Sequence, residues 1–194
     1  MKFTTEEVYR FLWGDMPLFA CQQWISEPES LTFFSEVHQQ ALQELAAKKE
    51  LSSEQLHQEI AAIFKASIHE GKYLTWVLQQ VLPWIIKEDS RACHGIDVLH
   101  DLEQQGLGFL SVISSVYLTG KNAGHFDWNA VRENVPTVKP GALYCLDMLN
   151  QGHIRIEHQR SYFLADFLHP HFAPVSDWKS AEKRHQQMIS PPSA

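Results

Sequence analysis

The sequence predicts a mainly α-helical protein, a single helical domain with a short β-hairpin near residues 153–165. Two observations lead to this prediction. Over most of the 194 residues, apolar side chains recur every three to four positions, which is the period of an α-helix. In the stretch IRIEHQRSYFL (154–164), the period drops to two, which is typical of paired strands. The hairpin is therefore an addition to a helical core.

The first two helices are short. Thr4 and Glu7 have the spacing of a capping box, and Gly14 is expected to end the helix that they open. Proline is favoured in the first turn of a helix, so a second helix is expected from Pro17 to Trp24.

Two longer helices should follow. Ser30 is expected to cap a third helix that ends near Lys48, and Ser52 or Ser53 should open a fourth that Gly71 stops. The third helix is expected to extend over the apolar residues Phe33, Phe34, Val37, Ala41, Leu42 and Leu45.

The segment 72–88 is apolar on several sides, so a buried central helix is expected there, kinked or split by Pro83. Residues 91–105 should form another helix. For 108–120, a helix is favoured, although its β-branched residues also fit a buried strand. Short helices are expected from Asp127 to Glu133 and from Pro140 to Leu149, and Ser176 should cap a last polar helix.

The best internal boundary is the turn-rich segment KNAGH (121–125). It divides a helical core, residues 1–120, from residues 121–190, which should hold a helix-turn-helix, the hairpin and a terminal helix. We expect the two parts to pack together as one domain.

The composition narrows the classes of function that fit this chain. The chain has 23 acidic residues against 16 Lys and Arg, a net charge of −7. This balance argues against broad binding to nucleic acid or anionic membranes, which needs a basic face. The three cysteines are far apart, as expected for reduced, buried thiols. The N-terminus lacks the apolar core of a signal peptide, so a cytoplasmic location is expected.

The segment from 108 onward has the order helix, helix, turn, helix, two-stranded ribbon. PGALYCLDMLNQGHI (140–154) resembles the third helix and first wing strand of winged-helix regulators, including the PadR-like group. The matching positions are Pro140, Gly141, Leu143, Tyr144, Leu146, Leu149, Gly152 and Ile154. This resemblance implies a winged-helix-like C-terminal part that binds nucleic acid.

The candidate binding residues of that segment are Lys139, Tyr144, His153, Arg155, His158 and Arg160. A recognition helix normally presents Arg, Lys, Asn or Gln to base edges. This helix offers only Asn150 and Gln151, at its C-terminal end, and Asp147 would face a polyanion. A hairpin that closes the helical core, or that contacts another protein, is therefore favoured.

Histidines suggest a metal as a further alternative. His100-Asp101 resembles the ligand pair of HD-type phosphohydrolases, with His69 upstream and Asp166 downstream, but other landmarks of that family are missing. Glu-x-x-His, a di-iron spacing, occurs at Glu54/His57 and again at Glu182/His185, both at polar helix ends. Chance alone gives such pairs in a chain with 11 histidines, so no metal or other cofactor is expected.

We expect a non-catalytic, acidic accessory or regulatory protein that binds another macromolecule, most plausibly a protein with a basic surface. Trp13 and Trp24, near turns, are possible anchors for a partner. The alternatives are a winged-helix nucleic-acid binder and an HD-type phosphohydrolase. No membrane partner is expected, and the oligomeric state stays open.

Overall fold

The computed structural model describes residues 4–47, 51–114, 121–122, 125–126, 128–129, 138–159 and 162–167. These residues are mainly helical, as predicted. The chain divides into two compact units, residues 1–73 and 74–194. We describe each unit by itself. The boundary expected at residue 120, and the packing of 121–190 onto the core, stay predictions.

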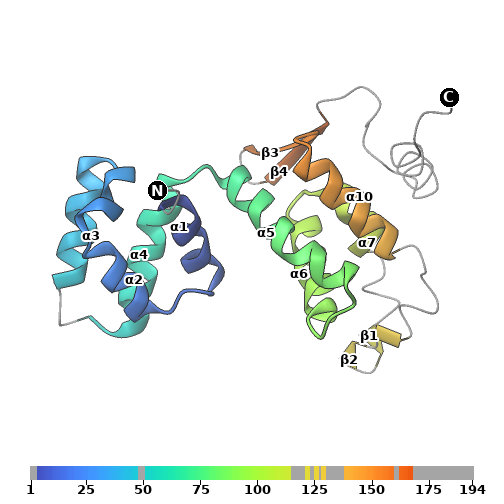
Figure 1. The fold of residues 1–194 in the computed structure, drawn as a ribbon, viewed down its shortest axis with the longest axis horizontal. Helices are drawn as coiled ribbons and strands as arrows, with labels where there is room; N and C mark the ends of the chain where they lie inside the picture. Colours follow the sequence, from blue (N-terminus) through green and yellow to red (C-terminus); the bar gives the residue numbers. More distant parts are fainter. Residues whose placement is uncertain are drawn as a thin grey trace. The chain divides into compact units, whose positions relative to one another are not determined.

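The first unit is a bundle of short helices (Figure 1). Helix α3 contacts α4, and α2 contacts both α3 and the 3-10 helix η1. Phe11, Phe34, Ile60 and Phe64 lie in the buried interior of this unit. The elements are α1 (Thr4–Trp13), α2 (Leu18–Ile25), η1 (Pro28–Phe33), α3 (Glu36–Ala47) and α4 (Ser53–Ser67).

The third helix was predicted wrongly. In place of one helix opened by Ser30, the chain forms η1, leaves helical geometry at Phe34 (φ −90°, ψ 154°), and begins α3 at Glu36. The Ser35 hydroxyl accepts from the His38 amide at 3.4 Å, and the Gln39 side chain donates to the Phe34 carbonyl at 2.8 Å. These local bonds satisfy backbone groups at the new helix start, so the break is favoured.

The fourth helix begins as predicted but ends early. Ser52 caps α4, and Gln55 completes the capping box. The helix ends at Ser67, because Ile68 is extended (φ −108°, ψ 161°). Gly71 is therefore not the stop that was expected; it lies in the first turn of α5 (Glu70–Ile86).

The second unit is built on α5 and α6 (Ala92–Gln104). Helix α5 runs through Pro83 unbroken, so of the kink or split predicted there the split does not occur. Helix α6 lies close to it: a Cβ atom added at Gly95 would be 3.3 Å from the Ile85 side chain and 3.4 Å from that of Val81. Glycine thus permits tight packing of the two helices. The remaining described helices are η2 (Gly108–Leu110), α7 (Ser111–Ser114) and α10 (Val138–Asn150).

The hairpin lies where the sequence placed it. Strands β3 (Ile154–Gln159) and β4 (Tyr162–Phe167) pair antiparallel, from Ile154 opposite Phe167 to Gln159 opposite Tyr162. Ile154 and Ile156 are buried while Arg155 is exposed, which is the alternation seen in the sequence. Gly152 (φ +70°) provides the left-handed residue that ends α10 before the strand.

A second, shorter pair was not predicted. Strands β1 (Lys121–Asn122) and β2 (His125–Phe126) pair antiparallel within the segment that was expected to be a turn. Most of the helix expected at 127–133, the end of the one at 108–120, and the one after Ser176 lie outside the described residues. Among the described helices, none is both long and apolar enough to cross a bilayer.

Candidate protein-binding surface

Large apolar side chains are exposed at four described positions: Phe19 (65%), Phe33 (39%), Val37 (75%) and Leu143 (37%). The first three belong to consecutive elements of the first unit, α2, η1 and α3, and α2 contacts both of the others. We call the exposed side chains of residues 15–47 the α2–α3 surface. Its concentration of exposed apolar side chains is typical of a place where another molecule binds.

This surface rests on a rigid aromatic cluster. The Phe33 ring packs edge-on against Phe34, with ring centroids 5.3 Å apart, and Phe34 is buried. Phe34 stacks on Phe64 at 5.5 Å, and Trp24 meets both rings edge-on, at 6.4 Å from Phe34 and 6.0 Å from Phe64. Aromatic pairs in these geometries are favourable, so the cluster holds Phe33 in place. Less conformational entropy is then lost on binding.

The break before α3 explains why Val37 is exposed. Because the helix begins at Glu36, its buried face carries Leu42 and Leu45. His38 also lies toward α4: its Nδ1 is 2.9 Å from the Ser67 hydroxyl. Val37, one position earlier, points away from this face. Phe33 and Val37 were predicted to lie on one uninterrupted helix, whereas they lie on η1 and α3.

The same surface is acidic. Between Arg10 and Lys48 there is no Lys or Arg, whereas the segment holds five carboxylates, Asp15, Glu27, Glu29, Glu36 and Glu44. All five are exposed. Among the described residues, no cation forms an ion pair with Glu27, Glu29 or Glu36. Residues 1–73 contain 6 Lys and Arg against 11 Asp and Glu, and thus carry −5 of the total charge of −7. The surface therefore presents uncompensated negative charge beside apolar side chains.

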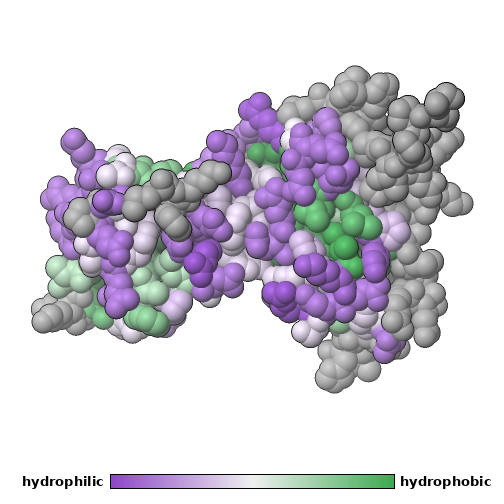
Figure 2. All heavy atoms as spheres, viewed as in Figure 1, coloured by the Kyte–Doolittle hydropathy of each residue, from purple (hydrophilic) through white to green (hydrophobic). Residues whose placement is uncertain are grey.

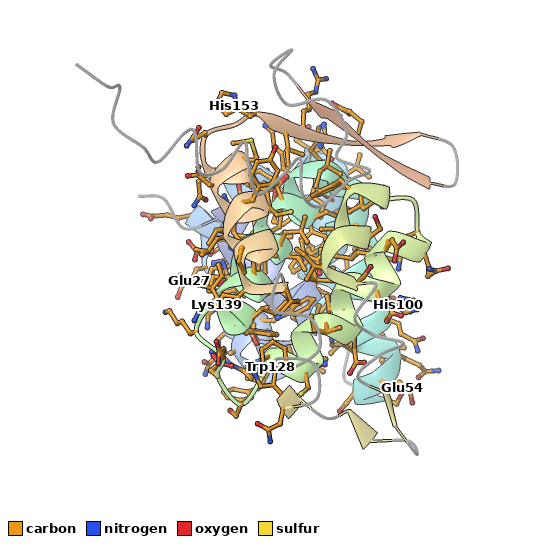
Figure 3. The ribbon with its side chains drawn as sticks, turned by 90° about the vertical axis from the view of Figure 1, so that its right-hand side faces the viewer. Glu27, Glu54, His100, Trp128, Lys139 and His153 are labelled. Carbon is orange, nitrogen blue, oxygen red and sulfur yellow. The ribbon has the colours of Figure 1, made fainter. Side chains whose placement is uncertain are left out.

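Two of the three predicted basic binding residues, Lys139 and Arg155, are paired within the second unit. Lys139 Nζ lies 3.1 Å from the Glu88 carboxylate, and the Arg155 guanidinium lies 2.5 Å from that of Glu157. Lys139 and His153 are at opposite ends of α10 (Figure 3). Neutralised and separated cations attract a phosphate backbone weakly.

The other predicted binding residues do not complete a basic face. Tyr144 is buried at 2% exposure, and His153 is half-buried. His158 lies in β3, but its side chain is outside the described part, as is Arg160 altogether. The six-residue binding set therefore stays a prediction.

The predicted metal ligands come from different parts of the chain. His69 lies in the first unit, where its carbonyl accepts the first backbone bonds of α5, from Lys72 and Tyr73. His100 and Asp101 are on α6, and Asp166 is on β4. His57, of the Glu-x-x-His pair, packs its ring on Phe11 at 4.6 Å. Within the described residues, no three His, Cys, Asp or Glu side chains gather as a metal ion requires.

One polar cluster contains catalytic residue types but lacks catalytic geometry. Buried Ser114 donates a 2.5 Å hydrogen bond to the Glu103 carboxylate, and His100 Nδ1 lies 3.8 Å from the same oxygen. In a nucleophile relay, histidine stands between the hydroxyl and the acid. Here the Glu103 carboxylate lies between Ser114 and His100. The arrangement therefore links α7 to α6 and does not activate the serine.

The buried cysteines are unsuited to nucleophilic chemistry. Burial raises the pKa of Cys21, and of Cys145, to about 12. Because the thiolate is the reactive form, both thiols are inert near neutral pH. Cys93, half-buried on α6, is likewise not part of a disulfide.

Comparison with protein families, with curated proteins and with solved structures finds no significant match. A usable signal was present in the sequence: Ser35 followed by Glu36 is a helix start, and 37 residues without a cation are unusual in an ordinary charged surface.

Proposed function

We propose that this protein is a non-catalytic, acidic accessory or regulatory protein that binds another protein through the α2–α3 surface. The observation that carries the proposal is the exposure of Phe19, Phe33 and Val37 in a segment without Lys or Arg. Aromatic side chains are enriched at the centres of protein interfaces, where they supply much of the binding energy. Carboxylates around them would give polar contacts at the rim.

A protein fits this surface better than the other macromolecules. Nucleic acids and anionic membranes are polyanions, which uncompensated carboxylates repel. A second copy that used the same surface would place equal negative charges face to face, which is also unfavourable. A partner that offers apolar pockets meets neither obstacle.

Affinity capture with the tagged full-length chain tests the role. We expect one protein to be recovered from extracts of the source cells with the native chain, and to be lost with the variant Phe19→Ala/Phe33→Ala/Val37→Ala. Leu143→Ala is the matched control, because it removes an exposed apolar side chain from the second unit. Equal recovery with the triple variant and the native chain would contradict the proposal.

A winged-helix nucleic-acid binder is the second candidate. It is supported by chain order, since the hairpin follows α10 directly through Gly152. The test is binding of duplex DNA at low salt, which should weaken steeply as salt is added because bound counterions are released. A lack of binding at low salt would remove this candidate. The phosphohydrolase alternative gains no support from the described residues.

A further inference from the structure

We infer that the partner's contact surface is a basic, amphipathic helical segment, in which Lys or Arg side chains flank a row of apolar ones. This inference rests on the proposed function and deepens it, because it names the chemistry of the partner. It depends on two properties of the α2–α3 surface. The exposed apolar side chains favour an apolar row on the partner, and the carboxylates without ion pairs favour basic residues beside that row.

The apolar side chains select the apolar row. Phe19, Phe33 and Val37 come from three successive elements, and α2 contacts both η1 and α3, so the surface offers several apolar contact points. A helix that presents apolar residues at positions i, i+3, i+4 and i+7 can contact several such points from one face. Phe33 is held by its edge-on packing against Phe34, so it can act as a fixed anchor.

The carboxylates select the flanking cations. Glu27 lies just before η1, Glu29 lies within it, and Glu36 begins α3, so all three border the segment that holds Phe33 and Val37. None of the three carboxylates has an ion-pair partner among the described residues. A basic partner could therefore use them without breaking an existing ion pair. Such rim charges raise the association rate and favour partners of opposite charge.

A second copy of the chain fits this chemistry less well. Residues 74–194 contain 10 Lys and Arg against 12 Asp and Glu, so the second unit, at −2, is also acidic. Two of its cations, Lys139 and Arg155, are already paired with Glu88 and Glu157. A different protein with a net basic contact surface is therefore favoured as the partner.

A synthetic peptide of Leu and Lys, patterned so that the leucines line one helix face, is the probe. Its binding to the full-length chain is measured by fluorescence anisotropy at low salt and at roughly physiological salt. Two further peptides serve as controls: one with Glu in place of Lys, and one with the same composition but the leucines scattered. We expect the patterned basic peptide alone to bind, and to bind less tightly as salt is added.

Variants locate the binding. The triple variant Glu27→Gln/Glu29→Gln/Glu36→Gln should weaken binding by roughly tenfold, which is the scale of several rim contacts together. Glu6→Gln/Glu54→Gln/Glu59→Gln changes the net charge equally at exposed positions outside the surface, and should change the affinity by less than about twofold. The variant Phe19→Ala/Phe33→Ala/Val37→Ala should weaken binding by roughly tenfold or more. Circular dichroism checks that each variant is folded.

The inference is overturned if the two charge variants weaken binding equally, since the effect is then one of total charge. It is also overturned if the scattered or acidic peptide binds as tightly as the patterned basic one. Its failure is distinguishable from failure of the proposed function. A partner that is captured through Phe19, Phe33 and Val37, but is insensitive to salt and to the Glu→Gln changes, would refute the basic chemistry and leave protein binding in place.

Discussion

The two units each expose apolar side chains, but in different electrostatic settings. In the second unit, Figure 2 shows an apolar area where α5, α6 and α10 meet, bordered by hydrophilic side chains. Among the described residues of this unit, Leu143 on α10 is the large apolar residue that is exposed. Each end of α10 forms a polar contact with α5 or with the residues just after it. Asn150 at the C-terminal end accepts a hydrogen bond from Gln79 at 3.0 Å, and Lys139 at the N-terminal end pairs with Glu88 at 3.1 Å.

The α2–α3 surface differs because three of its carboxylates form no ion pair with a described cation. Glu27, Glu29 and Glu36 have no described cation beside them, whereas Lys139 and Arg155 in the second unit are both paired. Exposure of an apolar side chain is therefore not enough to identify a binding surface. Unpaired charge beside it is what allows one partner to be selected over another.

The largest expected effect is on stability. It distinguishes the buried side chains beneath the α2–α3 surface from the exposed side chains that would contact a partner. Phe64 is fully buried and packs against Phe11, Trp24 and Phe34. Phe64→Ala should lower the free energy of unfolding by about 3–5 kcal/mol, whereas Phe33→Ala should cost only about 1 kcal/mol because its ring is partly exposed. Urea denaturation measures both. Equal losses would mean that Phe33 is a core residue and not a contact residue.

The next effect compares the buried thiols of the two units. Burial raises the pKa of Cys21 on α2 and of Cys145 on α10 to about 12, from an ordinary value of 9.0. A raised folded pKa gives stability that is fully present below the unfolded pKa and is lost as pH rises toward the folded one. Between pH 9 and 12 the free energy of unfolding should therefore fall, by up to about 1.4 kcal/mol per pH unit for each thiol.

Cysteine variants assign this pH dependence. Cys21→Ala and Cys145→Ala should each reduce the slope of unfolding free energy against pH above 9, and the double variant should reduce it further. Burial also raises the pKa of Tyr73 to about 12, so some slope should remain in the double variant. An unchanged slope in both single variants would show that neither thiol is buried as described.

A smaller effect tests whether the pair at Lys139 is only structural. Lys139→Met should lower the free energy of unfolding by less than about 1 kcal/mol, since exposed ion pairs contribute little. It should leave binding of the patterned basic peptide unchanged, because Lys139 lies outside the α2–α3 surface. A large loss of peptide binding in this variant would move the interface to the second unit.

The smallest expected effect on stability is at Val37. The side chain is exposed near the start of α3, and alanine has a higher helix propensity than valine. Val37→Ala should thus leave the unfolding free energy unchanged or raise it by a few tenths of a kcal/mol, at about the scale of helix propensities. It should still weaken peptide binding. Weaker binding without lower stability is typical of a contact residue, and the reverse result would place Val37 in the core.

Much of the fold follows from sequence patterns that depend on local geometry. The helical period, the serine expected to open the fourth helix and the alternation around Ile154 and Ile156 all predicted elements that the structure contains. These signals are reliable because each depends on neighbouring residues alone. The strands β1 and β2 were missed, since two residues are too few to show a period.

The candidate surface was harder to predict than the fold. The apolar spacing of Phe33, Phe34 and Val37 fits one amphipathic helix, and only the hydrogen bonds of Ser35 and Gln39 show that the chain breaks there. Ion pairing was also invisible in the sequence: Glu88 and Lys139 are 51 residues apart. Two of the basic residues that were predicted to bind, Lys139 and Arg155, are thus paired in the folded protein, and Phe33 and Val37 were predicted to share one uninterrupted helix.

Hydrogen exchange of the full-length chain, with and without the patterned Leu/Lys peptide, tests whether the α2–α3 surface is the binding site. We expect slower amide exchange in α2, η1 and α3 when the peptide is bound, with exchange in α10 and β3 unchanged. Protection of α10 and β3, with the three elements of the first unit unaffected, would contradict it.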